Sequence, residues 1–219
     1  SAAGGVMQML FRNPLVEPGF LGVSQGAGFG AAFSILFLGS APLMIETSAA
    51  VFGIIGLALS YFIARRIRFG GWVLRLVLSG IAVSALFSAG LGILKYMADP
   101  ATKLPEIVFW LMGGLWSVEW QDLLYILPVV LVGLIIIFLM RWRLNLLSLS
   151  DETAFSLGVS VGRERSLLLA ASVAITAVVV SVAGIVGWIG LIVPHITRRI
   201  TSANAAEFIP VSLPLGAVF

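Results

Sequence analysis

Four stretches without a charged residue dominate this chain of 219 residues. They cover Thr47–Ala64, Leu76–Leu94, Leu123–Met140 and Ser166–Pro194, and each is 18 to 29 residues long. A helix of roughly 17 to 25 apolar residues is long enough to cross the hydrocarbon core of a bilayer. Because lipid offers no hydrogen-bond partners, a spanning segment has to satisfy its backbone groups within a helix. Each stretch therefore predicts at least one membrane-spanning helix.

A fifth candidate span, Leu21–Leu38, lies in the acid-free interval between Glu17 and Glu46. Residues 1–11 are typical of the last part of a helix, and residues 208–219 are typical of the start of another. We therefore expect an all-α fold, a polytopic transmembrane helix bundle that is truncated at both ends.

The composition of the chain excludes several other classes of protein. Hydrophobic residues make up 60% of the sequence and charged residues 11%, whereas soluble domains carry about 25% charged residues. The sequence contains no cysteine, which excludes disulfides, thiolate metal sites and cysteine nucleophiles. The pI near 9.8 does not indicate nucleic-acid binding, because the Lys and Arg residues flank the apolar stretches instead of covering one face.

The basic residues predict the orientation of the chain. If the spans alternate and Ser166–Pro194 crosses twice, 11 of the 13 Lys and Arg residues lie on one side, with only Lys95 and Lys103 on the other. The positive-inside rule assigns the richer side to the cytoplasm. With 29 residues, Ser166–Pro194 is long for one crossing of the membrane and short for two. Both remain open, and we favour two because Gly184, Gly187 and Gly190 offer a break between two short helices.

The stretch Ile107–Val118 is apolar and rich in aromatic residues, but it is too short to span a membrane. It lies between Glu106 and Glu119, on the side predicted to be outside. We expect it at the outer membrane interface or dipping back into the membrane. An ordinary interfacial anchor and a gate-like segment remain equal alternatives.

Gly22, Gly26 and Gly30 recur at every fourth position in "LGVSQGAGFGAAF". This spacing predicts a smooth helix face on which another backbone can approach closely. A nucleotide-binding interpretation of "GAGFG" is disfavoured, because no strand precedes it and no acidic residue follows at the distance that ribose binding requires. We therefore assign these glycines to helix packing.

The sequence offers no pattern for catalysis or for metal binding. It lacks the Gly-Lys-Ser/Thr pattern that holds nucleotide phosphates, so this chain is not expected to hydrolyse ATP by that route. His195 is the only histidine, and a single imidazole without cysteine is a poor metal site. A polar cap at the cytoplasmic end of a helix is the preferred interpretation of His195. The spans seen whole have no ionisable residue near the middle, which disfavours an ion-coupled transporter.

Asn13, Pro14, Glu17 and Pro18 lie in the connection between the first two apolar segments. The two prolines prevent a continuous helix, so we predict a rigid cytoplasmic elbow. For Glu17, capping a helix that begins near Phe20 is favoured over pairing with a cytoplasmic arginine.

The segment Asn145–Ser166 is a polar interruption between the apolar stretch that ends at Met140 and the long one that begins at Ser166. Ser150 is a good N-cap, Asp151 and Glu152 suit the positive end of a helix dipole, and Gly158 is suited to end the helix after two turns. The spacing places three apolar residues partly on one side, namely Ala154, Phe155 and Leu157. A docking element for a soluble partner is favoured over a solvated loop with accidental helicity.

Four stretches together resemble the FecCD type of permease, the membrane subunit of type II ABC importers. They are "GGVMQMLFRNPLVEPGFLGVSQGAGFGA", "FWLMGGLWSVEW", "LSLSDETAFSLGV" and "GWIGLIVPHITRR". The resemblance covers the chain in order and implies a ten-helix permease, of which this chain runs from within the second helix to the start of the ninth. It also implies that the family's ATPase-coupling helix matches Leu149, Ser150, Asp151, Glu152, Thr153, Ala154, Leu157, Gly158 and Val159.

The resemblance further implies a function and a set of partners. Residues 1–219 would be a single transmembrane permease domain, with residues 145–166 as its cytoplasmic coupling segment. It would pass a metal chelate (iron-siderophore, haem or cobalamin) or an oxyanion across the cytoplasmic (inner) membrane of a prokaryote. Expected partners are a second permease copy, two ATPase subunits that use ATP and Mg²⁺, and an extracytoplasmic substrate-binding protein, with no cofactor held by this chain and no nucleic acid. The alternative is a gradient-driven carrier or channel without an ATPase.

Overall fold

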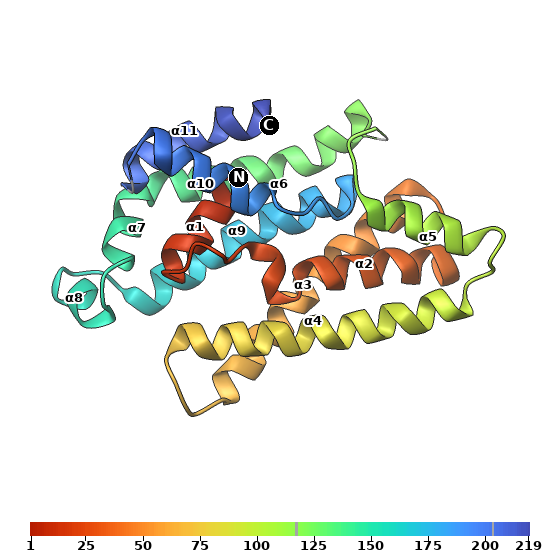
Figure 1. Ribbon diagram of the computed structural model, residues 1–219, viewed down its shortest axis with the longest axis horizontal. Coiled ribbons are helices and arrows are strands. Elements are labelled where there is room, and N and C mark those ends of the chain that lie inside the picture. Colours follow the sequence, from red (N-terminus) through yellow and green to blue (C-terminus); the bar gives the residue numbers. More distant parts are fainter. Residues whose placement is uncertain (117, 203) are drawn as a thin grey trace. The chain divides into compact units, whose positions relative to one another are not determined.

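All regular elements in the computed structural model are helices, among the residues that the structure describes, 1–116, 118–202 and 204–219 (Figure 1). The predicted all-α fold is confirmed. In chain order the elements are α1 (Ala2–Leu10), the 3-10 turn η1 (Pro18–Leu21), α2 (Val23–Phe33), the π turn η2 (Ser34–Leu38), α3 (Pro42–Arg66), α4 (Trp72–Met97), α5 (Lys103–Met112), α6 (Trp120–Leu139), α7 (Arg141–Leu147), α8 (Asp151–Ser156), α9 (Val161–Ala183), α10 (Ile189–Ile200) and α11 (Ala205–Val218).

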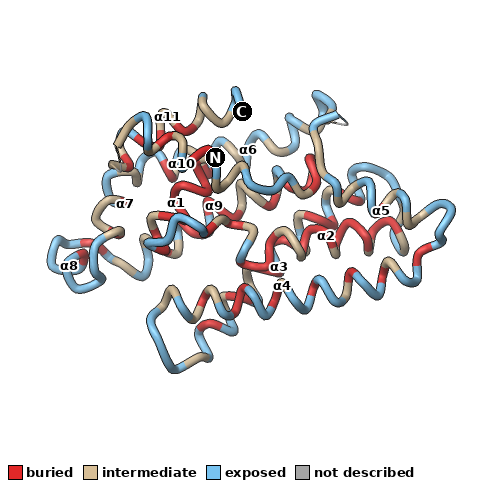
Figure 2. Tube along the Cα trace, viewed as in Figure 1, coloured by how far each residue is buried: buried red, intermediate tan, exposed pale blue. Residues whose placement is uncertain are grey.

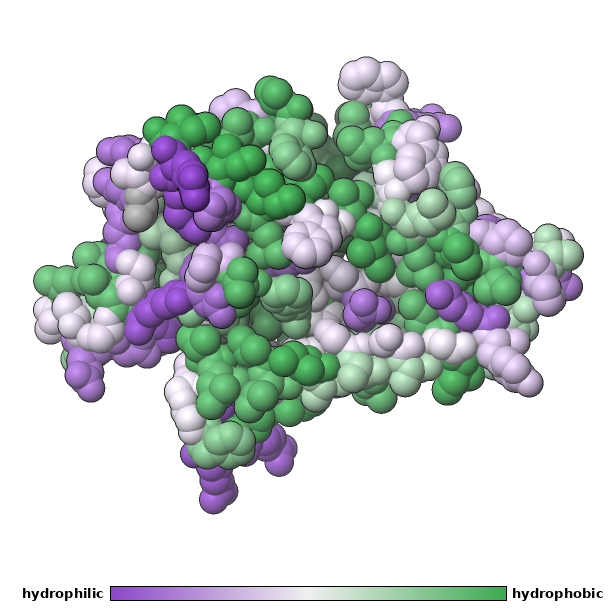
Figure 3. All heavy atoms as spheres, in the orientation of Figure 1, coloured by the Kyte–Doolittle hydropathy of each residue, from purple (hydrophilic) through white to green (hydrophobic). Residues whose placement is uncertain are grey.

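Four helices are long and apolar enough to cross a membrane, within the described residues. They are α3, α4, α6 and α9, with 25, 26, 20 and 23 residues, and each contains most of one predicted charge-free stretch. Figure 3 shows hydrophobic residues over much of the visible face, while hydrophilic atoms gather at the tip of the α3–α4 hairpin. Such apolar exposure suits lipid as the surrounding solvent.

Local sequence rules fix the ends of these long helices. Pro42 stands at the start of α3, where its missing N–H costs nothing, and Arg65 and Arg66 occupy the last turn near the negative end of the helix dipole. Asp122 lies in the first turn of α6, near the positive end. Charged residues therefore lie at the ends of these apolar helices, where they anchor the spans at the membrane surface.

The chain forms two compact units, which are described separately. One unit comprises Ser1–Pro18, Pro128–Ile175 and Gly187–Phe219, and the other comprises Gly19–Leu127 and Thr176–Val186. Helices α6 and α9 contribute one part to each unit. The first unit carries α1, α7, α8, α10 and α11, and the second carries α2, α3, α4 and α5.

In the second unit, α2 packs against α3 and α4, and most of α2 is buried (Figure 2). A methyl group added at Gly26 would overlap the backbone oxygen of Phe52, and one added at Gly30 would lie 2.5 Å from that of Ser48. The hydroxyl of Ser48 also donates to the Gly30 carbonyl at 2.7 Å. Gly22 precedes α2 in a left-handed conformation with φ 84°, so it does not belong to the helix face as expected. Its backbone still packs closely on α3, because a methyl group added at Gly56 would overlap the Gly22 carbonyl oxygen.

In the first unit, the corner between α10 and α11 is bonded to α7. Asn145 donates from its amide nitrogen to Oδ1 of Asn204 at 2.7 Å and accepts from the backbone N–H of Ala205 at 2.7 Å. Since α9 starts just after α8 and α10 ends at this corner, the chain leaves the α7–α8 end through α9 and returns to it through α10.

The predicted break in the last apolar stretch is present. Helix α9 ends at Ala183, Gly184 takes a left-handed φ of 68°, and α10 begins at Ile189. The expectation of two short helices was wrong, because α9 has 23 residues and only α10, with 12, is short. At 1.5 Å per residue, α10 is about 18 Å long, which is less than the hydrocarbon thickness.

In the part of the chain that the structure describes, three further apolar helices are shorter than a span: Ala2–Phe11, Val23–Leu38 and Ala205–Val218. The second is the fifth candidate span, formed as α2 continuing into the π turn η2. Its start moves from Leu21 to Val23 because Pro18–Leu21 form the 3-10 turn η1. The other two correspond to the partial helices expected at residues 1–11 and 208–219.

Gly26→Ala is expected to lower the free energy of unfolding by about 1–3 kcal/mol, the usual cost of overpacking. The reason is that the added carbon would meet the Phe52 backbone, which cannot rotate away. Thermal denaturation of the detergent-purified protein measures the effect. Gly92→Ala in α4 is the control, because nothing lies within 4 Å of its added carbon. Equal behaviour of the two variants would contradict close α2–α3 packing.

Candidate functional site

Helix α8 is a six-residue helix that stands between the spans α6 and α9, after the short helix α7. It lies within the polar segment Asn145–Ser166 singled out in the sequence, which also contains the end of α7 and the start of α9. Its neighbours in the first unit are α7, the C-terminal end of α1 and the start of α9. The surface that it offers is therefore the candidate functional site.

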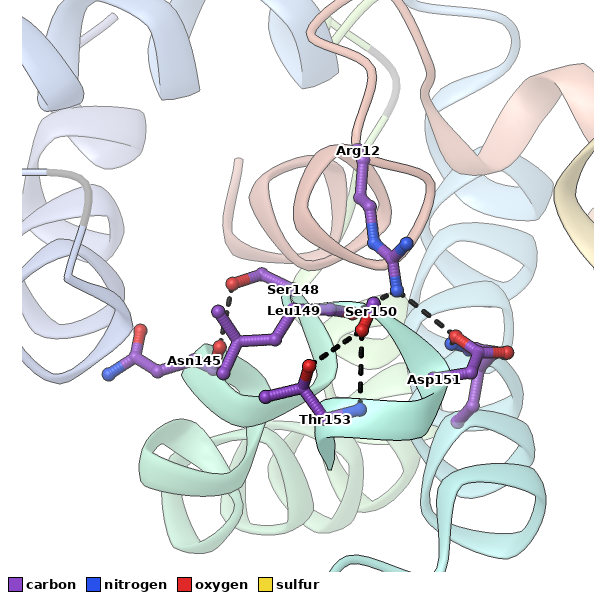
Figure 4. A network of polar contacts seen from close by, with 8 residues as sticks. Arg12, Asn145, Ser148, Leu149, Ser150, Asp151 and Thr153 are labelled. Carbon is purple, nitrogen blue, oxygen red and sulfur yellow. Dashed lines mark hydrogen bonds and ion pairs between the residues drawn. The ribbon is translucent and has the colours of Figure 1, made fainter. Parts of the chain in front are cut away.

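Ser150 caps the start of α8 (Figure 4). Its hydroxyl accepts from the backbone N–H of Thr153 at 3.2 Å and lies 2.7 Å from the Thr153 hydroxyl. Asp151 and Glu152 occupy the first turn, where their negative charge favours the helix. The sequence signals for a helix start thus have direct counterparts in the geometry.

The end of α8 is closed by a hydrogen-bonded glycine turn. Gly158 adopts φ 81°, its N–H donates to the Phe155 carbonyl at 3.0 Å, and the N–H of Val159 donates to the Ala154 carbonyl at 3.1 Å. This pair of bonds is a Schellman motif. Ala154 and Val159, the two apolar residues that the motif brings together, are both buried. Both ends of this very short helix are therefore fixed by specific hydrogen bonds.

The apolar residues of α8 do not share one side, which corrects the expectation from their spacing. Ala154 is buried against the protein, whereas Phe155 and Leu157 are 76% and 55% exposed. Leu149, just before the helix, is also exposed. A helix of six residues is too short for spacing alone to define its buried face, and the Schellman turn decides which residue points inward. The outward face is apolar beside acidic Glu152.

Asp151 is the centre of an ion-pair network. Nη2 and Nη1 of Arg165 donate to its two carboxylate oxygens at 2.7 and 3.2 Å, and Nη2 of Arg12 donates to Oδ1 at 3.0 Å. Hydrogen bonding from Arg165, with the charges of Arg165 and Arg12, holds the pKa of Asp151 below its usual range. The ion pairs thus stabilise the fold above the ordinary carboxyl pKa of about 4 and are lost only as the pH falls through the lower folded value.

A second ion pair joins α7 to α9. Arg143 donates to Oε1 of Glu164 at 2.9 Å, and the same oxygen accepts from the backbone N–H of Ser160 at 3.2 Å. Glu164 therefore contacts the residue that precedes α9 and also α7. Together with the Asp151 network, this pair fixes the α7–α9 segment at two points.

Nothing in the sequence indicated that Arg12 and Arg165 are partners of Asp151. Both had been counted only among the charges that set the orientation. Arg12 lies 139 positions from Asp151 in the chain, so no local spacing rule links them. Arg165 lies 14 positions away, beyond the reach of helix periodicity within α8.

The elbow joins α1 to η1 through a turn built by its own residues. Oδ1 of Asn13 accepts from the N–H of Leu15 at 2.9 Å, and Pro18 begins η1. Among the described residues, Glu17 has neither of its expected partners: no arginine pairs with it and it caps no helix. It packs beside Gly190, where an added methyl group would lie 2.9 Å from its carboxylate oxygen, and burial raises its pKa.

The aromatic stretch Ile107–Val118 forms α5 and the turn after it, with Ser117 outside the described residues. The end of α5 meets the end of α9: the N–H of Gly114 donates to the Ala183 carbonyl at 2.7 Å, and a methyl group added at Gly184 would overlap the Trp110 carbonyl. A cavity of about 170 Å³ lies beside this junction. Both the anchor and the gate interpretation of the stretch stay predictions.

His195 is exposed on α10. Within the residues that the structure describes, no three His, Asp or Glu side chains come together in a group suited to a metal ion. Helix α8 offers exposed apolar side chains and acidic charge on a backbone whose two ends are fixed by hydrogen bonds.

Comparison with known proteins gives this geometry a context. The FecCD transport family matches residues 1–219. The chain is 38% identical over 217 residues to the molybdate import system permease protein MolB of Haemophilus influenzae, covering 99% of this chain and 64% of that protein. It is 38% identical over 213 residues to the hemin transport system permease protein HmuU of Yersinia pestis, covering 96% of this chain and 64% of that protein.

A solved structure is also similar, that of a metal-chelate type ABC transporter in an inward-facing conformation. The TM-score is 0.91 at 39% sequence identity, and the match covers 99% of this chain and 69% of that chain. The chain thus has the fold of a type II ABC importer permease and is a multi-pass membrane protein. It spans 64% of the length of both curated relatives.

Gly158→Ala is expected to lower the free energy of unfolding by about 1–2 kcal/mol, because a left-handed backbone is unfavourable for a residue with a Cβ atom. The space around Gly158 is open, so no clash contributes. Gly162→Ala in α9 is the matched control, since its surroundings are also open and its backbone is helical. Thermal denaturation in detergent distinguishes the two, and an equal loss in both variants would argue against a required left-handed turn.

Proposed function

The chain belongs to the FecCD transport family, and from this premise we propose that it acts as the membrane permease subunit of an ABC importer. One permease domain formed by residues 1–219 would pass a metal chelate or an oxyanion across the cytoplasmic membrane of a prokaryote. The family match along the whole chain carries the proposal. Relatives named for molybdate and hemin transport support a cargo class that includes oxyanions and metal chelates such as iron-siderophores, haem and cobalamin.

The energy for transport would come from a separate ATPase subunit. The sequence has no Gly-Lys-Ser/Thr pattern for nucleotide phosphates. ATP and Mg²⁺ would therefore bind to the partner, and this chain would hold no cofactor. The exposed face of α8 is the surface that we assign to the ATPase subunit, because an exposed phenylalanine beside acidic residues on a stiff helix is suited to a protein partner.

The complete transporter would contain two copies of the permease and two ATPase subunits, with a substrate-binding protein on the outer side. Closed symmetry with a twofold axis is the commonest arrangement of such assemblies. Nucleotide-driven movement of the ATPase subunits would displace α8, and the spans would tilt to open the pathway to one side at a time. Contact with the cargo would be brief and largely apolar.

Uptake into vesicles tests the proposal against the rival class, a gradient-driven carrier or channel. Vesicles containing the full-length permease, the ATPase subunit and the binding protein are loaded with ATP, and uptake of molybdate, haemin, a ferric siderophore and cobalamin is measured. Uptake of at least one probe should require both ATP and the ATPase subunit. Uptake by the permease alone, driven by an ion gradient, would instead establish the rival.

Phe155→Ala is expected to weaken binding of the ATPase subunit about tenfold or more, the usual effect of removing an aromatic anchor. The permease itself should fold normally, because the Phe155 side chain is 76% exposed. Co-purification and titration of the two subunits in detergent measure the affinity. Tyr96→Ala is the control, since Tyr96 is 91% exposed at the opposite, outer end of α4 as the orientation predicts. Unchanged affinity for Phe155→Ala would exclude this face as the docking surface.

A further inference from the structure

We infer that Asp151 connects α8 mechanically to the membrane bundle, with Arg12 linking it to α1 and the elbow and Arg165 linking it to α9. This inference rests on the proposed function and assigns positioning roles to three residues whose contacts are shown in part in Figure 4. Partner binding would act on the outer face of α8. The Asp151 network would carry the resulting displacement inward.

The link to α9 is strong because Arg165 is buried. Only 7% of its side chain is exposed, and its guanidinium makes two hydrogen bonds with the Asp151 carboxylate. A buried cation needs a counter-charge, and paired hydrogen bonds fix the orientation of both groups. Movement of the α8 N-terminus away from α9 would separate this cation from its counter-charge. The start of α9 therefore has to follow α8.

The link to the elbow depends on an unusual backbone conformation. Arg12 has φ 51°, which is uncommon for a residue with a side chain. In this conformation its guanidinium donates both to the backbone carbonyl of Leu149 and to Asp151. Asn13 follows directly and bonds back to Gln8. The direction in which the elbow leaves α1 is thus set where Arg12 contacts the start of α8.

The network differs from an ordinary surface ion pair. Arg12 and Asp151 are 42% and 57% exposed, so their pair alone would contribute little stability. Its distinguishing feature is that one carboxylate accepts from two cations of different segments, Arg12 in the turn after α1 and the buried Arg165 in α9. Arg163, two positions before Arg165, is an exposed arginine of the same helix for which no ion pair is recorded in the described part of the chain. It provides a matched comparison.

A cysteine reporter in the elbow tests the inference without knowledge of the cargo. The chain has no natural cysteine, and Leu15 is 70% exposed. In the assembled complex carrying Leu15→Cys, the rate of modification by a charged maleimide is compared with and without ATP and vanadate. We expect nucleotide to change this rate about tenfold, within the usual range of coupling between sites. Arg163→Gln should leave that change intact.

Asp151→Asn is expected to abolish the nucleotide-dependent change at Leu15→Cys. The ATPase subunit is added to saturation, so that any loss of docking affinity at α8 does not enter the comparison. Because this substitution removes the counter-charge of Arg165, the double variant Asp151→Asn/Arg165→Gln is measured as well. If the Asp151 network only stabilised the fold, the double variant would regain thermal stability and would also regain the nucleotide-dependent change in modification rate at Leu15→Cys. We expect stability to recover and the response to stay absent. Arg12→Gln should also abolish the response at the elbow.

The possible failures can be distinguished. If the natural sequence neither binds an ATPase subunit nor supports its ATP hydrolysis, the proposed function fails. If the complex assembles and hydrolyses ATP, but Asp151→Asn retains the response at Leu15→Cys, the inference about Asp151 is overturned. The inference is also overturned if the complex with natural Asp151 hydrolyses ATP without any change at Leu15→Cys.

Discussion

Inside hydrocarbon, every backbone N–H and C=O group needs a hydrogen-bond partner within the protein. This constraint governs the structure. It makes long helices the natural form of the apolar stretches and restricts irregular backbone to places where another segment supplies the missing bonds. The break after α9 illustrates this restriction, because the Ala183 carbonyl accepts from Gly114 while Gly113 and Gly184 let the two backbones meet. Outside the spans, α7 and α8 can be short because side chains and backbone turns close their ends.

The same constraint determines how much of the structure could be read from the sequence. Spans α3, α4, α6 and α9, the break at Gly184 and both ends of α8 follow local rules of length, charge and capping, and they were predictable. The partners of Asp151 were not, since Arg12 reaches it only through tertiary packing. The buried face of α8 was also missed, because a Schellman turn decides it and six residues are too few for a clear periodicity. The prediction that Glu17 caps a helix beginning near Phe20 was wrong, because Pro18–Leu21 form the 3-10 turn η1 and α2 begins only at Val23.

The helices of the second unit are held together by close backbone packing. Gly26 and Gly30 let α2 approach the α3 backbone, and the Ser48 hydroxyl bonds across the contact. In lipid, such packing and buried hydroxyl bonds hold helices together where the hydrophobic effect between spans is weak. If the proposed displacement reaches the second unit, α2, α3 and α4 would move together. A flexible bundle would absorb the same displacement within its loops.

Stiffness is equally necessary where the displacement would enter. A six-residue helix has little intrinsic stability in water, so α8 would unravel under load if only its own backbone bonds held it. The Ser150 cap and the Gly158 turn close its two ends, and buried Ala154 and Val159 attach it to the protein. Asp151 then places the charge of α8 against a cation buried at the start of a span. A short polar helix thus acquires the rigidity of the membrane helices beside it, which explains how a small exposed element could act on a large apolar bundle.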